Sequence, residues 1–430
     1  MSGHFFWYAT GFGLHLALPQ LVLFPLCLHF MGADSFGKFI YAVGIVSMVG
    51  LAPTKGLTDT FLRNIAGIAD QRRSLFLHTT FTLAACLVGS ILLLVILTCL
   101  FINFFSQRGG DVVFWIAIIA LAFAAQNMID VGIVDLRFKR QFKVAAFWQS
   151  IGSALAFLAL PALFLIGNWG VPIGFSTGHI LAFVLLLAVR GNNFVGRPYF
   201  DKAMAKRIGA TWFVLSVSVL FLLSSHYIHR TMLGLCASYK MVSVFFAASA
   251  TLAICIMPIG LLGLFGIPIL SAHNSIERFS PRFCRLYSVA TVVGGALFYA
   301  LVILVARWPL YLLYPAVAHS ATKLIPLMGV GISMTVLVHA VRPFVIKFAS
   351  SRTLLLIGIV SLISHCGSAI ILVPKWGLRG AAWAYCIGNS IVALNWFGVF
   401  VAKFAWRINT DNKGTSVDSI DPGSKNTYDR

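Results

Sequence analysis

Acidic residues, and charged residues in general, are scarce in this chain. Only 12 Asp and Glu residues accompany 32 Lys and Arg among 430 residues, and the four types together make up 10% of the sequence. Hydrophobic residues make up 59%, and the mean hydropathy is +0.91. A water-soluble domain of this length needs far more charge to cover its surface. The composition therefore indicates a helical protein that crosses a membrane many times.

Sequence motifs of an enzyme are missing as well. No GxSxG, HExxH, Walker or GxGxxG pattern stands in a suitable context, and the polar connections are too short to hold a catalytic domain. The eight cysteines form no CxxC pair and fall mostly within apolar runs, so we expect them to be small core residues. We expect a protein that is not an enzyme and that binds no cofactor, no ATP and no metal.

Twelve stretches are apolar and long enough to cross a bilayer as helices, which takes about 20 residues. They cover residues 5–30, 31–66, 75–105, 112–134, 144–167, 171–189, 208–233, 236–268, 287–306, 324–341, 354–373 and 380–402. We expect Pro258 and Pro268 to shorten or kink the eighth helix. No Lys or Arg precedes Lys38, so the basic segment of a cleavable signal peptide is missing and we expect the first helix to be retained.

The basic residues alternate between the two sides of these helices. If the N-terminus is cytoplasmic, the inside segments carry 23 Lys and Arg and the outside segments carry 8. Every inside segment carries more than every outside segment, as the positive-inside rule requires. A miscount by one helix would invert this pattern downstream. We therefore expect twelve helices with both termini in the cytoplasm, and topology explains the net charge of +20 without nucleic-acid binding.

The twelve helices divide evenly along the chain. Residues 1–189 and 208–403 each contain six, and the basic segment 190–207 joins them. Residues 404–430 are rich in polar residues, and we expect a disordered cytoplasmic tail there. Repeated bundles that face each other across a cavity are common in transporters. The predicted fold class is an all-α integral membrane protein with two pseudo-symmetric six-helix lobes around a central cavity.

Four stretches, in the same order, carry a resemblance to a known family. Residues 31–66 hold a Gly-Ala-Asp turn, then Phe-Gly, Gly56-Leu57 and Arg63-Asn64-Ile65-Ala66; the others are LRFKRQFKVAAFWQSIGSALAF from residue 136, HYIHRTMLGLCASYK from residue 226 and LVPKWGLRGAAWAYCIGN from residue 372. Together they resemble the polysaccharide-exporter (Wzx-type) branch of the MOP flippase superfamily. His229 departs from the pattern, because that position in the family usually carries an acid.

The resemblance implies a bacterial flippase that moves an undecaprenyl-pyrophosphate-linked oligosaccharide across the cytoplasmic membrane by alternating access. A polysaccharide polymerase and a chain-length regulator are the partners that it implies. The alternative is a drug/cation antiporter of the related MATE branch, which also has twelve helices. Membrane acids are scarce, with Asp59 and Asp130 the main candidates, and a cationic cavity suits an anionic pyrophosphate better than a cationic drug.

Charged residues near helix ends are candidates for substrate binding. Lys55, Asp59 and Arg63 lie toward the cytoplasmic end of the second helix. Lys55 has two readings: it snorkels to the interface and pairs with Asp59 one turn on, or it lines the cavity mouth and meets the pyrophosphate. His226 and Arg230 lie toward the outer end of the seventh helix, where an interfacial role is the alternative.

Polar residues nearer the middle of the membrane are candidates for proton coupling. They are His15, His179, His365 and Asp130. Histidine is the side chain that titrates near neutral pH with the least perturbation. The alternatives are that each histidine is hydrogen-bonded between helices and that Asp130 only pairs with a nearby arginine, Arg137 or Arg140.

Overall fold

The computed structural model describes residues 13–15, 17–64, 70–105, 110–139, 141–191, 202–271 and 281–405. Within these ranges the regular elements are all helices, and no residue lies in a strand. For some helical residues only the backbone position is described. These residues include three of the predicted site residues, Asp59, Arg63 and His226.

The first half of the chain, up to residue 191, contains seven α-helices and three short irregular helices in its described part. They are η1 (Pro19–Leu23), α2 (Phe24–Asn64), α3 (Asp70–Phe105), α4 (Gly110–Gly132), α5 (Val134–Phe138), α6 (Phe142–Leu155), η3 (Ala156–Leu158), α7 (Ala159–Ile166), η4 (Gly167–Trp169) and α8 (Gly170–Arg190). The second half contains α9 (Lys202–Cys236), α10 (Tyr239–Ser271), α11 (Pro281–Val305), α12 (Arg307–Leu313), α13 (Pro315–Thr322), α14 (Ile325–Phe348) and α15 (Ser351–Ala405).

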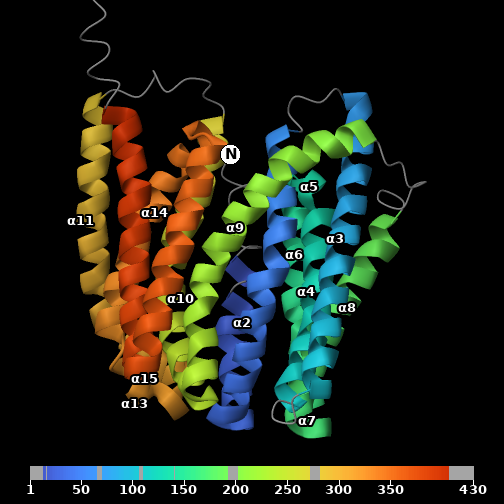
Figure 1. Cartoon of the computed structure of the whole chain (residues 1–430), viewed down its shortest axis with the longest axis vertical. Helices are drawn as coiled ribbons and strands as arrows, with labels where there is room; N and C mark the ends of the chain where they lie inside the picture. Colours follow the sequence, from blue (N-terminus) through green and yellow to red (C-terminus); the bar gives the residue numbers. More distant parts are fainter. Residues whose placement is uncertain are drawn as a thin grey trace, which may run out of the picture.

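Two glycines reverse the chain inside what is otherwise continuous helix. Gly32 in α2 has φ 77° and Gly377 in α15 has φ 53°, a backbone region that side chains with a Cβ rarely enter. Helix α15 therefore holds two membrane passes, and α2 joins the end of the first pass to the second. Gly167, with φ 65°, lies between the passes formed by α6–α7 and α8. We call the end of the molecule that carries these three turns the hairpin end, and the opposite end the loop end (Figure 1).

The helix lengths and compositions are those of a multi-pass membrane protein. Eight described stretches are long and apolar enough to cross a membrane, and three of them turn back at Gly32, Gly167 or Gly377 and so hold two passes each. The 35-residue helix α9, whose side chains are described only in part, supplies the remaining pass. The twelve predicted passes are thereby confirmed in the described part of the chain.

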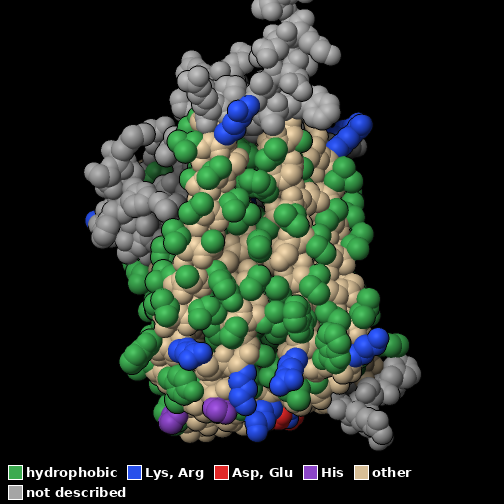
Figure 2. Space-filling model, turned by 90° about the vertical axis from the view of Figure 1, so that its left-hand side faces the viewer, with side chains coloured by type: hydrophobic (Ala, Val, Ile, Leu, Met, Phe, Trp, Pro, Cys, Tyr) green, Lys and Arg blue, Asp and Glu red, His purple; other side chains and the backbone are tan. Residues whose placement is uncertain are grey.

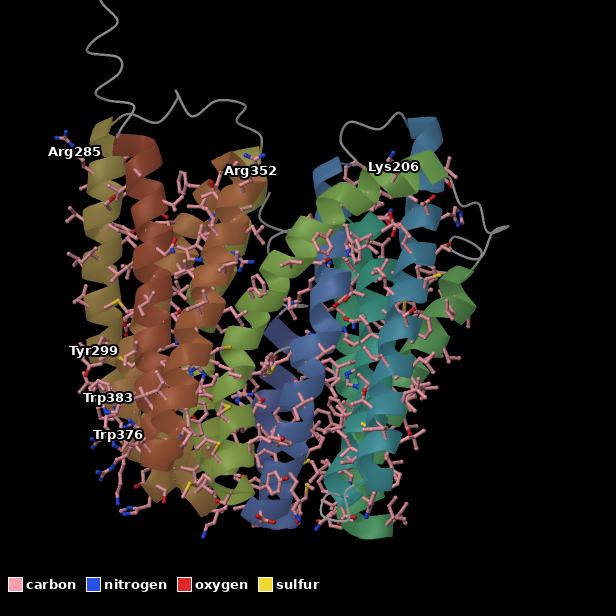
Figure 3. The ribbon with its side chains drawn as sticks, in the orientation of Figure 1. Lys206, Arg285, Tyr299, Arg352, Trp376 and Trp383 are labelled. Atoms are coloured by element: carbon pink, nitrogen blue, oxygen red, sulfur yellow. The ribbon has the colours of Figure 1, made fainter. Side chains whose placement is uncertain are left out.

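Helix α9 lies between the two groups of helices. Figure 1 shows α2 to α8 on one side, α10 to α15 on the other, and α9 running obliquely between them. It packs against both α2 and α15. Three basic residues from segments predicted to be inside, Lys206, Arg285 and Arg352, lie together at the loop end (Figure 3).

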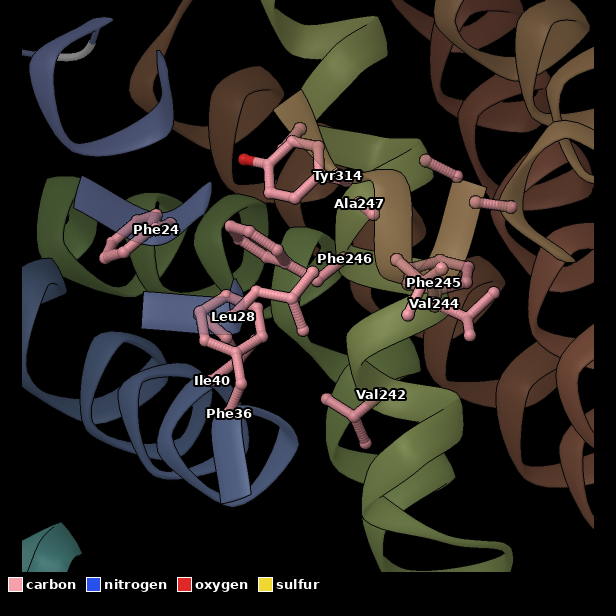
Figure 4. Packing of buried hydrophobic residues seen from close by; sticks show 14 of the residues in the cluster. Phe24, Leu28, Phe36, Ile40, Val242, Val244, Phe245, Phe246, Ala247 and Tyr314 are labelled. Carbon is pink, nitrogen blue, oxygen red and sulfur yellow. The ribbon is translucent and has the colours of Figure 1, made fainter. Parts of the chain in front are cut away.

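A shared hydrophobic core joins the two halves toward the hairpin end. Phe24 and Phe36 of α2 each lie 5.5 Å, centroid to centroid, from the ring of Phe246 of α10, and the Tyr314 hydroxyl donates a hydrogen bond of 2.7 Å to the carbonyl oxygen of Gln20 (Figure 4). These aromatic residues are all buried. Close aromatic packing of this kind excludes water and holds the halves together there. We call these four aromatic residues the aromatic seal.

Toward the loop end, the described core is divided. One cluster joins α2, α3 and the start of α9 around Leu57, Phe61 and Phe76. Another joins α11, α14 and α15 around Phe344 and Phe400. Apart from the start of α9, neither cluster joins the two groups of helices, so α2 to α8 and α10 to α15 share a hydrophobic core at one end only.

Three local features refine the expectations. Helix α10 continues through Pro258 to Ser271, so proline does not shorten it, and the expected kink stays a prediction. Neighbouring helices can satisfy the backbone groups that a proline frees in a membrane helix. The segment between α11 and α14 forms two short helices, α12 and α13. Cys86 and Cys236 are exposed, so not every cysteine is a core residue.

Candidate functional site

Polar residues of the first half gather in one group, which we call the N-half cluster. It consists of His15, Asp130, Arg137, Gln149, Ser153 and His179. His15 Nδ1 lies 2.8 Å from the Ser153 hydroxyl, which in turn donates to the His15 carbonyl oxygen at 3.1 Å. Asp130, Lys55 and Arg137 all lie close enough to interact electrostatically with the His15 ring. The structure therefore brings together three predicted residues that are far apart in the sequence, His15, Asp130 and Lys55.

Asp130 and Arg137 form an ion pair within this cluster. Their closest nitrogen and oxygen atoms, Arg137 Nη2 and Asp130 Oδ1, lie 3.6 Å apart, and Arg137 Nη2 also donates to Gln149 Oε1 at 3.4 Å. A distance of 3.6 Å is too long for a hydrogen bond, and Asp130 Oδ1 has no hydrogen-bond partner among the described residues. Asp130 therefore pairs with Arg137, as the alternative reading predicted, and its Oδ1 atom still has no hydrogen-bond partner among the described residues.

His179 lies beside the same group. Its Nδ1 is 2.9 Å from the Phe175 carbonyl oxygen, a contact within α8 and not the hydrogen bond between helices that the simpler reading predicted. Gly152, next to Ser153, lies against this ring and against Gln126, and a Cβ on Gly152 would stand only 2.9 Å from Gln126 Oε1. His179 is close enough to His15 for electrostatic interaction. Its ring is thus part of the cluster, although its hydrogen bond is local.

The position of Lys55 is fixed by its neighbours. Thr54 donates to Asn127 Oδ1 at 2.7 Å, and Asn127 Nδ2 donates to the Gly50 carbonyl oxygen at 2.8 Å, which ties α2 to α4. Gly56 lets α9 approach, since a Cβ there would stand 2.6 Å from the Ser216 backbone nitrogen. The Lys55 side chain itself is exposed while Thr54 and Gly56 are buried. Its predicted partner Asp59 has no described side chain, so that pairing stays a prediction.

In the second half, two histidines meet in the protein interior. His365 Nδ1 lies 3.5 Å from His229 Nε2, and both side chains are at most 1% exposed. Gly388 makes room for this contact, because a Cβ there would stand 2.3 Å from His365 Nδ1. The Tyr385 ring is 5.7 Å from the His229 ring. His365 was a predicted candidate, whereas His229 was noted only as a departure from the family pattern, and that departure was the signal that could have revealed it.

Arg230 lies next to this pair and points inward. Its Nη2 donates to the Ser249 hydroxyl at 3.0 Å, and its guanidinium carbon lies 4.9 Å from the Phe246 ring centroid and 5.6 Å from that of Tyr227. The Nε atom is buried with no hydrogen-bond partner in the part of the chain that is described. Phe246 belongs to the aromatic seal, so Arg230 lies where the two halves meet. Arg230 thus packs against α10 at this junction, and its role stays a prediction. We call His229, Arg230, Ser249, His365 and Tyr385 the C-half cluster.

The two halves of the chain differ in how their charged side chains are paired. The first half has four ion pairs among its described residues, of which Arg190 to Asp135 is the shortest at 3.1 Å. Between residues 202 and 405 the sequence has a single acid, Glu277, and it lies outside the described ranges. No described residue of the second half can therefore neutralise Arg230. An unpaired cation in a dry interior is costly unless an anion reaches it.

Comparisons with known proteins add a fold but no close relative. No family model matches the sequence, and no curated protein matches it. An inward-facing multidrug resistance MATE family transporter of the MOP superfamily has a TM-score of 0.70 at 17% identity, over 95% of this chain and 96% of that chain. The lipid II flippase MurJ, in an inward closed conformation, has a TM-score of 0.71 at 14% identity, over 96% and 93%.

A eukaryotic MATE transporter gives a similar result, with a TM-score of 0.67 at 14% identity over 95% of this chain and 98% of that chain. At these identities the likeness shows the fold alone. The chain has the all-helical membrane fold that MATE transporters and the lipid II flippase share within the MOP superfamily. The likeness extends equally to both kinds of protein, so the Wzx-type branch remains a prediction.

Proposed function

We propose that the protein is a flippase for an undecaprenyl-pyrophosphate-linked oligosaccharide, such as an O-antigen or exopolysaccharide repeat unit, in a bacterial cytoplasmic membrane. It works by alternating access of the lobes 1–189 and 208–403. The fold supports this proposal, because the lipid II flippase is among the proteins that share it. A polysaccharide polymerase and a chain-length regulator are its expected partners.

Arg230 is the observation that carries the proposal. It is half-buried between the halves, it stacks on Phe246 and Tyr227, and none of the described residues forms an ion pair with it. Such a guanidinium suits a bidentate contact with a phosphate group. A pyrophosphate that passes between the lobes would supply the missing negative charge, so the site favours an anionic substrate over a cationic one.

The arrangement of the core supports a path for the headgroup. Helices α2 to α8 and α10 to α15 share a core at the aromatic seal, whereas toward the loop end their cores are separate and only the start of α9 packs on the first-half cluster. By the positive-inside rule the loop end is the cytoplasmic side. The headgroup would enter there, meet the exposed Lys55 first and reach Arg230 near the seal. Separation of Phe246 from Phe24 and Phe36 would then open the outer side.

The N-half cluster is the proposed coupling site. His15 and Asp130 provide two groups that can exchange protons, and Arg137 and Lys55 respond electrostatically to their charge. Arrival of an anion at Lys55 would favour protonation nearby, so that binding and protonation are linked. A proton gradient could then drive the cycle without a nucleotide.

The test uses purified protein in vesicles with a fluorescent undecaprenyl-pyrophosphate oligosaccharide. We expect the labelled lipid to become accessible on the opposite face faster than in protein-free vesicles and faster than with Arg230→Gln protein at equal amount. Equal rates in all three preparations would refute the proposal.

A cation antiporter of the MATE type is the second candidate. Asp130 favours it, since a buried carboxylate oxygen without a hydrogen-bond partner among the described residues can bind a proton or a cation. In the same vesicles, an antiporter would exchange a cationic dye for protons and would lose this activity on Asp130→Asn. A flippase would show no such exchange.

A further inference from the structure

A pocket of about 490 Å³ opens near the hairpin end of the second half, away from both clusters. It is formed by the end of α13, the start of α14 and the second pass of α15. Its lining residues are Ser320, Lys323, Leu324, Leu327, Leu378, Arg379, Ala382 and Trp383. The volume lies within the range of about 300–1,000 Å³ that is usual for small-ligand sites. The lining thus combines two cationic side chains with several apolar ones.

The two basic residues of this pocket have no partner of opposite charge. Lys323 and Arg379 are both exposed, and neither makes an ion pair or a hydrogen bond with a side chain in the described ranges. The described part of the second half contains no Asp or Glu at all. Arg307 and Lys375 add further positive charge at the same end of the chain's second half. The pocket therefore lies in a region of positive potential, which attracts anions.

The pocket also lies at the depth of lipid headgroups. Trp376 and Trp383, with 57% and 46% of their surface exposed, lie near the hairpin end together with Tyr299 (Figure 3). Exposed Trp and Tyr are typical of the boundary between hydrocarbon and water. Above them, the surface is covered by apolar side chains, while basic side chains gather below (Figure 2). Leu297 and Leu304 of α11, for example, are 66% and 72% exposed.

We propose that this pocket binds the headgroup of an anionic phospholipid, with phosphatidylglycerol as the simplest example. Lys323 and Arg379 hold the phosphate by charge-assisted hydrogen bonds. Basic pockets between membrane helices bind anionic headgroups in this way. Leu324, Leu327 and Leu378 can contact the first methylene groups of the acyl chains. Free phosphate has no apolar part and would make no use of these contacts. The site is independent of the proposed transport function, because neither Arg230 nor Lys55 takes part.

The test is a lipid titration of the purified full-length protein in detergent, with bound lipid counted by native mass spectrometry. The pocket variant is Lys323→Gln with Arg379→Gln. The matched control is Arg307→Gln with Lys375→Gln, which removes the same charge from the same end but from residues that do not line the pocket. We expect wild-type protein to bind one phosphatidylglycerol at least about tenfold more tightly than phosphatidylcholine. The pocket variant loses this preference, and the control keeps it.

Three results would overturn the proposal. Equal weakening in the pocket and control variants would mean that diffuse charge attracts the lipid. Equal affinity for phosphatidylcholine would mean that the phosphate contact lacks selectivity for an anionic headgroup. Displacement of the lipid by millimolar inorganic phosphate would identify a phosphate site without lipid recognition. A thermal-unfolding midpoint of the pocket variant in lipid-free detergent, equal to that of wild type, excludes misfolding as the cause of a loss.

Discussion

Half-buried arginines of the first half of the chain face carboxylates, whereas Arg230 of the second half does not. Arg137 lies 3.6 Å from Asp130, and Arg190 lies 3.1 Å from Asp135. Arg230 instead contacts a hydroxyl and two aromatic rings. Paired charges hold helices in place and can pass protons, but an unpaired cation is ready to receive an anion. On this comparison rests our proposal that the first half couples transport to protons and the second half recognises the anion.

The largest expected effect is on transport by Arg230→Gln. Because this change removes the buried charge that would meet the pyrophosphate, we expect the flipping rate in vesicles to fall by about 30-fold or more. Arg230→Lys should recover part of the activity, since it keeps the charge but loses the planar fork. The matched comparison is Arg137→Gln, whose charge is already balanced by Asp130. If Arg137→Gln lowers the rate as much, the two halves do not differ in the proposed way.

Lys55 should be second in effect on transport. We expect Lys55→Ala to reduce export about tenfold or more at an unchanged protein level, and Lys55→Arg to keep part of it, because a phosphate contact needs positive charge. Complementation of a flippase-deficient strain, with membrane protein quantified by immunoblot, measures this. Normal export by Lys55→Ala would favour the snorkelling reading.

Loss of stability should be larger for a variant of the first half than for Arg230→Gln, the reverse of the expected order for transport. Asp135→Asn leaves Arg190 without its closest carboxylate, and the two side chains are only 6% and 11% exposed. We expect a loss of roughly 3 kcal/mol in unfolding free energy. Arg230→Gln removes a charge that has no carboxylate partner in the described part of the chain, so stability should stay equal or rise. Thermal unfolding of both variants in one detergent makes the comparison, and a lower midpoint for Arg230→Gln would contradict it.

The smallest expected effect concerns the proton gradient. His15 lies among Asp130, Lys55, Arg137 and His179 in the first half, so we expect His15→Gln to weaken the dependence of flipping on the gradient by a few-fold. His365→Gln should have less influence, because no described carboxylate lies in its half. Flipping by wild-type protein at the same rate with and without a pH gradient would remove the coupling role.

The passes of the fold were predictable because bilayer thickness and the placement of Lys and Arg leave few alternatives. Gly377 illustrates this, since it reverses the chain in the connection between the predicted helices 354–373 and 380–402. The pairing of His229 with His365 was not predictable, because 136 residues separate them and no periodic pattern links them. The inward orientation of Arg230 was equally hidden, since it depends on how α9 lies against α10. Packing between distant helices leaves no mark in local sequence.

Binding of the pyrophosphate headgroup to wild-type and Arg230→Gln protein tests the central claim most directly. The purified proteins are titrated with one undecaprenyl-linked sugar carried on pyrophosphate and with the same sugar carried on a single phosphate. Wild type should prefer the pyrophosphate by about tenfold, and Arg230→Gln should bind the two lipids equally. An unchanged preference in Arg230→Gln would contradict the assignment of anion recognition to the second half.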